Sequence, residues 1–218
     1  HRIIHNYDFY VKEFCLKVTD MKKRIAKLAR TTNESSVEIE LNIDGTGKYS
    51  VETGNGMFDH MLAQLSRHGL IDLVVKSTGD IQVGWHHVIE DTGIVLGRAI
   101  SEAVGDAKGI VRMGQSIVPL DEALAMVAID FGGRGYASIE TDLTETDMGE
   151  LSPQLVQHFL ETLAREGRFN LHVRILAGYS NHHKVEAVFK GIARSMRSAL
   201  SIEPRVANET PSTKGVID

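Results

Sequence analysis

Apolar and polar residues alternate and then change to helical spacing twice along the chain. Residues 35–43 (SSVEIELNI) alternate in the manner of a strand with one buried face, and a second short strand is expected at 47–53. Residues 57–69 (MFDHMLAQLSRHG) place apolar side chains three and four apart and end at a glycine, which predicts a helix. A strand at 71–77 and a helix at 86–105 follow. The pattern therefore predicts the order β-β-α-β-α.

The same order returns in the second part of the chain. The expected elements are strands at 123–133, 135–143 and 170–178 and helices at 152–167 and 182–201. Ser152 is a good N-cap for the first of these helices, and Pro153 suits its first turn.

An ungapped alignment of residues 59–79 with residues 157–177 supports an internal repeat. The two stretches share a histidine, an arginine, a glycine and several apolar positions. We interpret the match as the duplication of a half-domain, with repeats at about 33–110 and 119–203. The predicted fold class is α+β, with sheets packed against helices.

The two ends of the chain differ from the repeats. Residues 1–20 lack the layout of a signal peptide, because charges break up their apolar residues, and we interpret them as an extension or a cloning-derived segment. One domain is expected over 21–218. Its tail at 204–218 is polar, contains Pro204 and Pro211, and is expected to form an extended arm.

Composition narrows the class of protein. A net charge of −5 gives no electrostatic reason to expect a nucleic acid or an anionic membrane as partner. No apolar run reaches the roughly 18 residues of a membrane span. The single cysteine, Cys15, argues against a disulfide framework and a cysteine-rich zinc site, and we expect a cytoplasmic protein.

Histidine carries the candidate chemistry. The motif His-His-x-x-Glu occurs at residues 86–90 and again at 182–186. Residues four apart lie on one face of a helix, so His86 and Glu90 can bind one ion. Adjacent residues point about 100° apart, so His87 is expected to reach a second ion.

Two ions satisfy both motifs. Each ion would take a His and the Glu from one motif and the single His from the other. His60 and His158, which are equivalent in the repeat, add one ligand each, and the spacing leaves open which of them joins which ion. Three imidazoles and a carboxylate suit Mn²⁺, with Fe²⁺, Co²⁺ and Zn²⁺ as alternatives. The predicted metal ligands are His60, His86, His87, Glu90, His158, His182, His183 and Glu186.

His68 and His172 have no repeat partner, and we interpret them as ordinary surface or strand histidines.

Six motifs resemble imidazoleglycerol-phosphate dehydratase, in family order and at family spacing over about residues 24–216. They are RTTNES, FDHMLAQLSRHG, HHVIEDTGIVLG, DFGGRGYA, HHKVEAVFKGIARSMRSAL and PSTKGV. The resemblance implies a duplicated α+β fold of the ribosomal protein S5 domain 2-like class. It also implies a large homo-oligomer of cubic symmetry, of about 24 subunits, with two Mn²⁺ ions per active site and sites between subunits. The implied reaction is the conversion of imidazole glycerol phosphate to imidazole acetol phosphate and water in histidine biosynthesis.

The resemblance also implies roles for residues outside the metal motifs. Glu34 is the candidate acid/base, with Glu186 as a second candidate because of its place near the metals. The residues expected to bind substrate or its phosphate are Glu34, Arg112, Arg134, Lys190, Ser212 and Lys214. Arginine, lysine and hydroxyl donors suit a phosphate dianion.

The chain departs from the family pattern at three places. Gly84 and Trp85 stand where the family usually has two aspartates, and Val88 stands where it usually has Thr or Asn. Residues 132–135 are Gly-Gly-Arg-Gly, where many members have Ser-Gly-Arg-Pro. None of these replaces a predicted ligand, so we expect an effect only on the support of the first motif.

The implied reaction gives a chemical reason for two ions. The substrate carbon that loses its proton has no neighbouring carbonyl. An imidazole ring with both nitrogens bound to metal would ionise to an imidazolate and expel the hydroxyl, and a base would then remove the carbon-bound proton from a diazafulvene-like intermediate.

Two other functions are compatible with the sequence alone. A dinuclear hydrolase would need bridged ions roughly 3.5–4 Å apart. A metal-storage or structural oligomer would not need the phosphate-binding residues.

Overall fold

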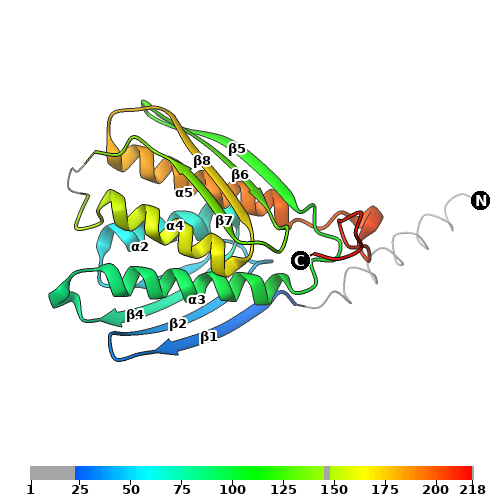
Figure 1. Ribbon diagram of the computed structural model, residues 1–218, viewed down its shortest axis with the longest axis horizontal. Coiled ribbons are helices and arrows are strands. Elements are labelled where there is room, and N and C mark those ends of the chain that lie inside the picture. Colours follow the sequence, from blue (N-terminus) through cyan, green and yellow to red (C-terminus); the bar gives the residue numbers. More distant parts are fainter. Residues whose placement is uncertain (1–22, 145–147, 218) are drawn as a thin grey trace, which may run out of the picture.

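The computed structural model describes residues 23–144 and 148–217, and the predicted extension at 1–20 lies outside this range. The described chain is a sandwich in which two four-stranded sheets lie on the outside and four long helices fill the space between them (Figure 1). Each sheet and its helices come from one half of the chain.

The first half forms one sheet and two of the helices. Its elements are β1 (Ile25–Thr31), β2 (Ser35–Asn42), β3 (Tyr49–Glu52), α2 (Gly56–Gly69), β4 (Asp72–Gly79), the 3₁₀ turn η1 (Ile81–Val83) and α3 (His86–Val104). The strand order is β1-β2-β4-β3, in which β3 runs parallel to β4 and the other pairs are antiparallel.

The second half repeats this arrangement. Its elements are β5 (Met113–Leu120), β6 (Ala123–Asp130), β7 (Tyr136–Glu140), α4 (Pro153–Gly167), β8 (Asn170–Ala177), α5 (Asn181–Leu200) and, in the arm, the 3₁₀ turn η2 (Pro204–Val206). The order β5-β6-β8-β7 and the parallel β7–β8 pair match the first sheet. The duplicated α+β architecture predicted from the sequence is confirmed.

Each half contains one strand more than the sequence pattern predicted, at its beginning. These strands, β1 and β5, lie at the edge of their sheets. β1 carries Lys27 and Arg30 among its apolar residues, and β5 contains Gly114 and Pro119. Charged residues and proline are tolerated at sheet edges, and they weaken the alternation by which a strand is identified.

Side chains of the residues before them cap three of the four helices. Asn55 accepts a hydrogen bond from Phe58 N at the start of α2, and Ser180 accepts one from His183 N at the start of α5. Ser152 caps α4, as the sequence predicted. Trp85 precedes α3 without a side-chain cap.

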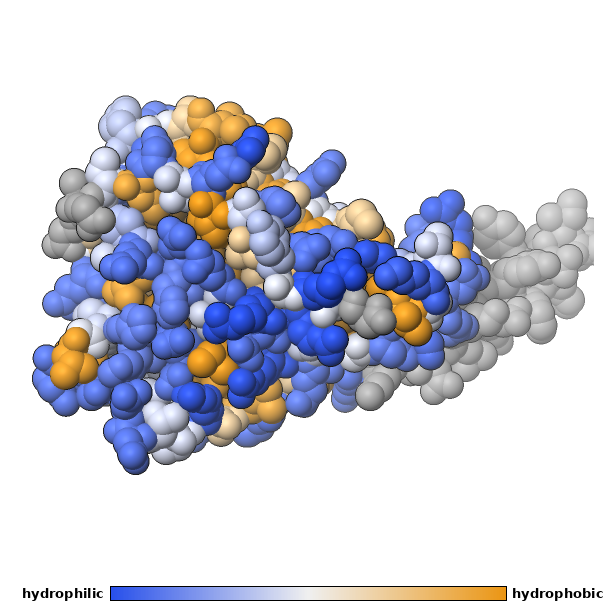
Figure 2. Space-filling view, viewed as in Figure 1, coloured by the Kyte–Doolittle hydropathy of each residue, from blue (hydrophilic) through white to orange (hydrophobic). Residues whose placement is uncertain are grey.

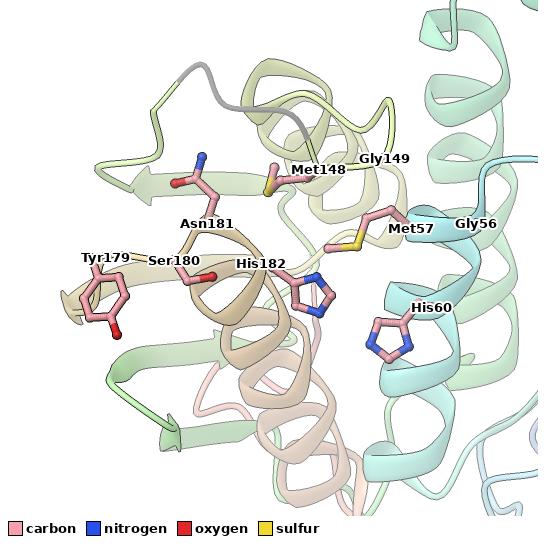
Figure 3. A pocket seen from close by; sticks show the side chains of 9 residues that line it. All are labelled: Gly56, Met57, His60, Met148, Gly149, Tyr179, Ser180, Asn181 and His182. Carbon is pink, nitrogen blue, oxygen red and sulfur yellow. The ribbon is translucent and has the colours of Figure 1, made fainter.

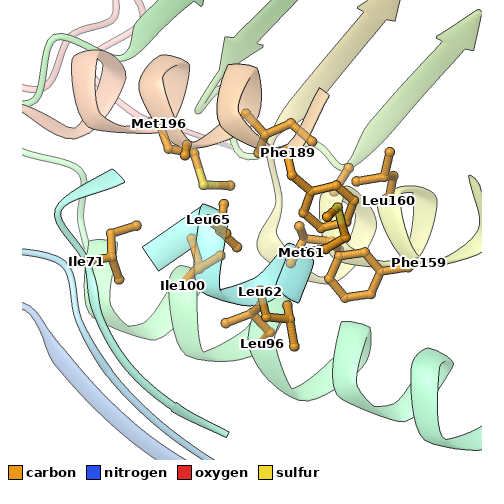
Figure 4. Packing of buried hydrophobic residues seen from close by; sticks show 14 of the residues in the cluster. Met61, Leu62, Leu65, Ile71, Leu96, Ile100, Phe159, Leu160, Phe189 and Met196 are labelled. Carbon is orange, nitrogen blue, oxygen red and sulfur yellow. The ribbon is translucent and has the colours of Figure 1, made fainter. Parts of the chain in front are cut away.

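Helices of the two halves pair crosswise in the middle of the molecule. α3 packs against α4, and α2 packs against α5, while α3 covers β1 and β2 and α5 covers β5 and β6. The rings of Phe58 and Phe159 meet edge to face at 5.0 Å, and Phe159 stacks on Phe189 at 5.8 Å. Figure 4 shows apolar side chains from all four helices meeting there. One core therefore joins both halves.

In the part of the chain that the structure describes, no helix is both long and apolar enough to cross a bilayer.

The crossing of α3 and α4 depends on Gly97, where a Cβ atom would lie 2.8 Å from Gly167 N and 2.9 Å from Leu163 O. Gly97→Ala gains about 1 kcal/mol of helix propensity, but forcing the helices apart costs about 1–3 kcal/mol. We therefore expect a lower free energy of unfolding, measured by urea titration of the metal-free protein. Gly56→Ala is the control, because a Cβ at that helix position meets nothing within 4 Å. Equal stability of the two variants would contradict the close crossing.

Candidate metal centres and phosphate cavity

The α2–α5 cluster consists of His60, His182 and Glu186. His60 Nε2 lies 3.1 Å from Glu186 Oε2, and His182 Nε2 lies 3.2 Å from the same oxygen. Figure 3 shows the two rings facing each other in a cavity of roughly 650 Å³, and their centroids are 5.8 Å apart. One nitrogen or oxygen from each of the three residues falls within 4.8 Å of the others, so the three can bind one ion together.

The α3–α4 cluster consists of His86, Glu90 and His158. His86 Nε2 lies 3.3 Å from Glu90 Oε2, and His158 Nε2 lies 3.4 Å from Glu90 Oε1. The two rings stack at 4.8 Å. His158 Nε2 is buried and makes no hydrogen bond. Buried polar atoms rarely lack a partner, and a metal ion would supply one.

Helix pairing decides which histidine joins which motif within the chain. The spacing of these residues in the sequence does not decide whether His60 or His158 accompanies each motif. His60 joins the second motif because α2 packs on α5, and His158 joins the first because α3 packs on α4. Each cluster offers two imidazole nitrogens and a carboxylate without sulfur, a donor set that fits first-row divalent metals.

His87 and His183 lie outside both clusters. His87 Nδ1 is 2.8 Å from Asp80 Oδ1, and His183 Nδ1 is 2.7 Å from Glu122 Oε2. These hydrogen bonds raise the pKa of both histidines, and the pKa of Glu122 falls to about 2. In each case Nε2 is the ring atom left to bind a metal.

Exposed acids lie beyond the Nε2 atoms of these two histidines. Glu34 Oε2 is 3.8 Å from His87 Nε2, and Asp121 Oδ2 is 3.7 Å from His183 Nε2. Asp91, which is buried, accepts a hydrogen bond from Ser35 Oγ and pairs with Arg30. This buried contact fixes the turn between β1 and β2, which carries Glu34.

Glu186 is ionised in spite of its partial burial. Burial raises its pKa, but hydrogen bonds from Lys190 and His60 outweigh that effect and bring the pKa to about 2. Lys190 Nζ lies 2.7 Å from Glu186 Oε1. Lys190, which the resemblance suggested for substrate, therefore contacts the α2–α5 cluster in this chain.

The two remaining histidines differ in their surroundings. His172 is exposed on β8, as expected for a strand histidine. His68 is half-buried, and its Nε2 lies 3.1 Å from Gln64 Oε1, while Gln64 Nε2 lies 3.5 Å from His60 Nδ1. Burial, with Lys190 and Arg194 nearby, lowers the pKa of His68. His68 is thus linked to a metal cluster through Gln64 and is not an ordinary surface residue.

Four of the residues expected to bind phosphate line one cavity of roughly 510 Å³ at the arm: Arg112, Arg134, Ser212 and Lys214. The guanidinium of Arg112 donates to both Asp130 oxygens at 2.7 and 3.0 Å, and its Nη1 donates to Pro211 O at 3.0 Å. Arg112 therefore holds the arm in place. Lys190 does not line this cavity.

The cavity and the α2–α5 cluster lie at opposite ends of α5. Arg112 N donates to Ala199 O at 2.8 Å, near the end of the helix, whereas His182 is in its first turn. With a rise of about 1.5 Å per residue, these two helix positions are roughly 26 Å apart. Figure 1 shows the arm, in red, at the far end of the helical layer from the start of α5.

The departures near the first motif are accommodated locally. Gly84 adopts a φ of 108°, a conformation that favours glycine. Trp85 Nε1 donates to Glu150 Oε2 at 3.1 Å and so ties the start of α3 to the loop before α4. Val88 is fully buried. The first motif is therefore held by packing and by this contact.

Sequence reasoning missed Asp80 and Glu122. Strand register points to Glu122. Ile39 pairs with Val75, and Val127 pairs with Val173. Because Val75 and Val173 are equivalent in the repeat, Ile39 and Val127 are equivalent too, and the same difference in residue number makes Glu122 the counterpart of Glu34. Asp80 has no such signal.

Comparison with known proteins gives the family. The sequence profile of imidazoleglycerol-phosphate dehydratase matches residues 53–196. Imidazoleglycerol-phosphate dehydratase from Dehalococcoides mccartyi (strain CBDB1) is 48% identical over 198 residues, which are 91% of this chain and 100% of that relative.

This chain belongs to the imidazoleglycerol-phosphate dehydratase family.

Other members of the family agree in sequence and in fold. The dehydratase from Methanococcoides burtonii is 47% identical and covers 89% of this chain and 100% of its own. The crystal structure of the Pyrococcus furiosus member in complex with (S)-C348 superposes with a TM-score of 0.75 at 32% identity, covering 87% of this chain and 99% of that one. The Staphylococcus aureus N315 member gives 0.74, also at 32% identity, and covers 82% of this chain and 99% of that one. The fold is that of the family.

Removing one carboxylate should remove one ion. We expect Glu90→Gln and Glu186→Gln each to bind about half the metal of the wild type, because each change weakens one cluster and leaves the other intact. Metal per chain after equilibrium dialysis measures this. Glu140→Gln, which removes a charge from an exposed ion pair on β7, is the control. If only one of the two cluster variants loses metal, the assignment of two separate clusters is wrong.

Proposed function

We propose that this chain dehydrates imidazole glycerol phosphate to imidazole acetol phosphate and water, as a hydro-lyase of histidine biosynthesis in the cytoplasm. Family membership supports the reaction class. The observation that carries the proposal is the pair of His/Glu clusters, one on each pair of crossed helices, together with a separate cavity lined by cationic side chains.

We assign two Mn²⁺ ions to each active site. The α2–α5 and α3–α4 clusters each supply three donors, and His87 and His183 of neighbouring chains each add a fourth. Three imidazoles and one carboxylate would hold Mn²⁺ at each cluster and would leave room for the substrate imidazole to bind. Fe²⁺, Co²⁺ and Zn²⁺ are alternatives for the same donors.

Ions held by the α2–α5 and α3–α4 clusters would lower the pKa of the N–H of the substrate ring, and the ionised ring could then supply the electron pair that expels the neighbouring hydroxyl. Glu34 is the base that we assign to the carbon-bound proton. Its side chain is 59% exposed and lies close to His87, on the turn that Asp91 holds in place. Glu186 is a poorer candidate, because Lys190, His60 and His182 already engage its carboxylate.

The size of the substrate requires a site shared between chains. Its ring and phosphate are joined by three carbons and span about 8 Å at standard bond lengths. The metal cluster and the phosphate cavity of one chain are separated by nearly the length of α5. We therefore propose that the arm of one chain serves the metal clusters of another, in a homo-oligomer of about 24 subunits.

The outer face of the second sheet supports self-association. Met113, Ile117 and Leu176 are 58%, 62% and 49% exposed on it, and Figure 2 shows apolar surface over these strands. The corresponding face of the first sheet is charged, with Lys27, Glu38, Glu40 and Lys76 exposed. Exposed apolar side chains gathered on one face of a sheet are typical of an interaction surface.

The alternatives fit less well. A dinuclear hydrolase requires a bridge between its ions, but the two clusters share no carboxylate among the described residues. A storage protein has no use for a cavity lined by Arg112, Arg134 and Lys214.

Turnover should depend on metal. Protein loaded with Mn²⁺ is expected to form imidazole acetol phosphate, and protein treated with a chelator is expected to lose this activity and regain it when Mn²⁺ is returned. Product formation is measured directly. A metal-loaded protein that leaves the substrate unchanged would sink the proposal.

The arm should act through its lysine. Lys214→Ala removes a charged hydrogen-bond donor worth about 1.5–3 kcal/mol, so kcat/KM should fall about 10- to 100-fold, mainly through KM. Deletion of residues 215–218 removes the apolar lining of the cavity, Val216 and Ile217, but keeps its cationic side chains, and should have a smaller effect. The phosphate assignment fails if the deletion is more damaging than Lys214→Ala.

A further inference from the structure

We propose that Asp80 and Glu122 are positioning residues that fix His87 and His183 with Nε2 as the metal-binding atom. This inference rests on the proposed function, in which each of these histidines completes a cluster on a neighbouring chain. Neither carboxylate belongs to either cluster, and neither reaches a metal-binding atom of the histidine that it contacts.

The two contacts are short and mostly shielded. The side chains of Asp80 and Glu122 are 26% and 21% exposed, and their bonds to the Nδ1 atoms measure 2.8 and 2.7 Å. Glu122 is held at its other oxygen as well, because Oε1 accepts from Ser180 N at 2.9 Å and from Tyr179 N at 3.3 Å. A carboxylate fixed in this way also fixes the plane of the imidazole ring.

The contact also selects the tautomer. A carboxylate only accepts hydrogen bonds, so Nδ1 must carry the proton and donate it. Neutral imidazole then presents the lone pair of Nε2, the form that binds metal. His87 and His183 lie outside both clusters, so this contact orients them where no cluster partner does.

The two halves build the same contact from residues that are not repeat equivalents. In the second half, Glu122 directly precedes β6 and holds His183. Its counterpart Glu34 directly precedes β2, but Asp80, which follows β4, takes the Nδ1 atom of His87. Glu34 is thereby left exposed on the Nε2 side of the ring. Because Asp80 and not Glu34 holds the ring of His87, the carboxylate of Glu34 is available as the base of the proposed reaction.

Metal titration of the assembled protein tests this inference. We expect Asp80→Ala and Glu122→Ala each to lower the affinity for one of the two Mn²⁺ ions about 10- to 100-fold and to leave the affinity for the other unchanged. This is the usual effect of losing a carboxylate that supports a metal ligand. Free Mn²⁺ is counted from its electron paramagnetic resonance signal. Asp80→Asn and Glu122→Gln keep an acceptor oxygen and should restore part of the affinity.

A matched control separates hydrogen bonding from charge. Asp121→Asn removes a negative charge 3.7 Å from His183 Nε2 but leaves the Nδ1 contact intact, so its effect should be much smaller than that of Glu122→Ala. If Asp121→Asn is as damaging, the proposed positioning role is wrong and the acids act only through charge.

The outcomes distinguish this inference from the proposed function. If the wild type binds two ions and neither alanine variant weakens one, the inference fails while the proposed function stands. If the wild type binds no Mn²⁺, the proposed function itself fails. If an alanine variant lowers the melting temperature of the metal-free protein, the matching isosteric variant, Asp80→Asn or Glu122→Gln, replaces it in the test. Weaker binding of one Mn²⁺ ion by the isosteric variant supports the inference, and unchanged binding of both ions overturns it.

Discussion

The crosswise pairing of helices is the constraint on which the rest of this structure depends. Each sheet must cover one apolar face, and helices from its own half do so. Those helices still have a second face to bury, and they bury it against the other half: α2 against α5 and α3 against α4. A duplicated half-domain thus gains a core only by pairing with its copy. The same pairing brings a histidine from each half to the His-His-x-x-Glu motif of the other.

The direction of the helices has a functional consequence. Both motifs lie in the first turns of α3 and α5, so the metal-binding side chains gather at one end of the helical layer. The chain leaves α5 at the opposite end, and there the arm and Arg112 form the cationic cavity. A substrate much shorter than α5 cannot reach both. In the proposed enzyme, folding of one chain therefore prepares two half-sites, and association of chains completes them.

Local sequence pattern was sufficient to predict most of the fold and the residues of both metal clusters. The repeat and the i, i+4 spacing identified all six residues that the structure groups into clusters, and the motifs identified the family. Helix pairing is a tertiary property, so spacing left the partners of His60 and His158 open. The edge strands β1 and β5 lack clean alternation and were missed. Asp80 and Glu122 are distant in sequence from the histidines that they contact, and no motif marks them. Lys190 contacts Glu186 within its own chain, a detail that the resemblance did not supply.

Subunit complementation tests most directly the central claim that the active site is shared between chains. Lys214→Ala chains and Glu186→Gln chains would be dissociated by metal removal, mixed, and reassembled with Mn²⁺. Turnover would be measured at a substrate concentration far below the KM of Lys214→Ala. We expect activity well above that of either variant reassembled alone, because intact clusters on one kind of chain meet intact arms on the other. A mixture no more active than its parents would contradict it.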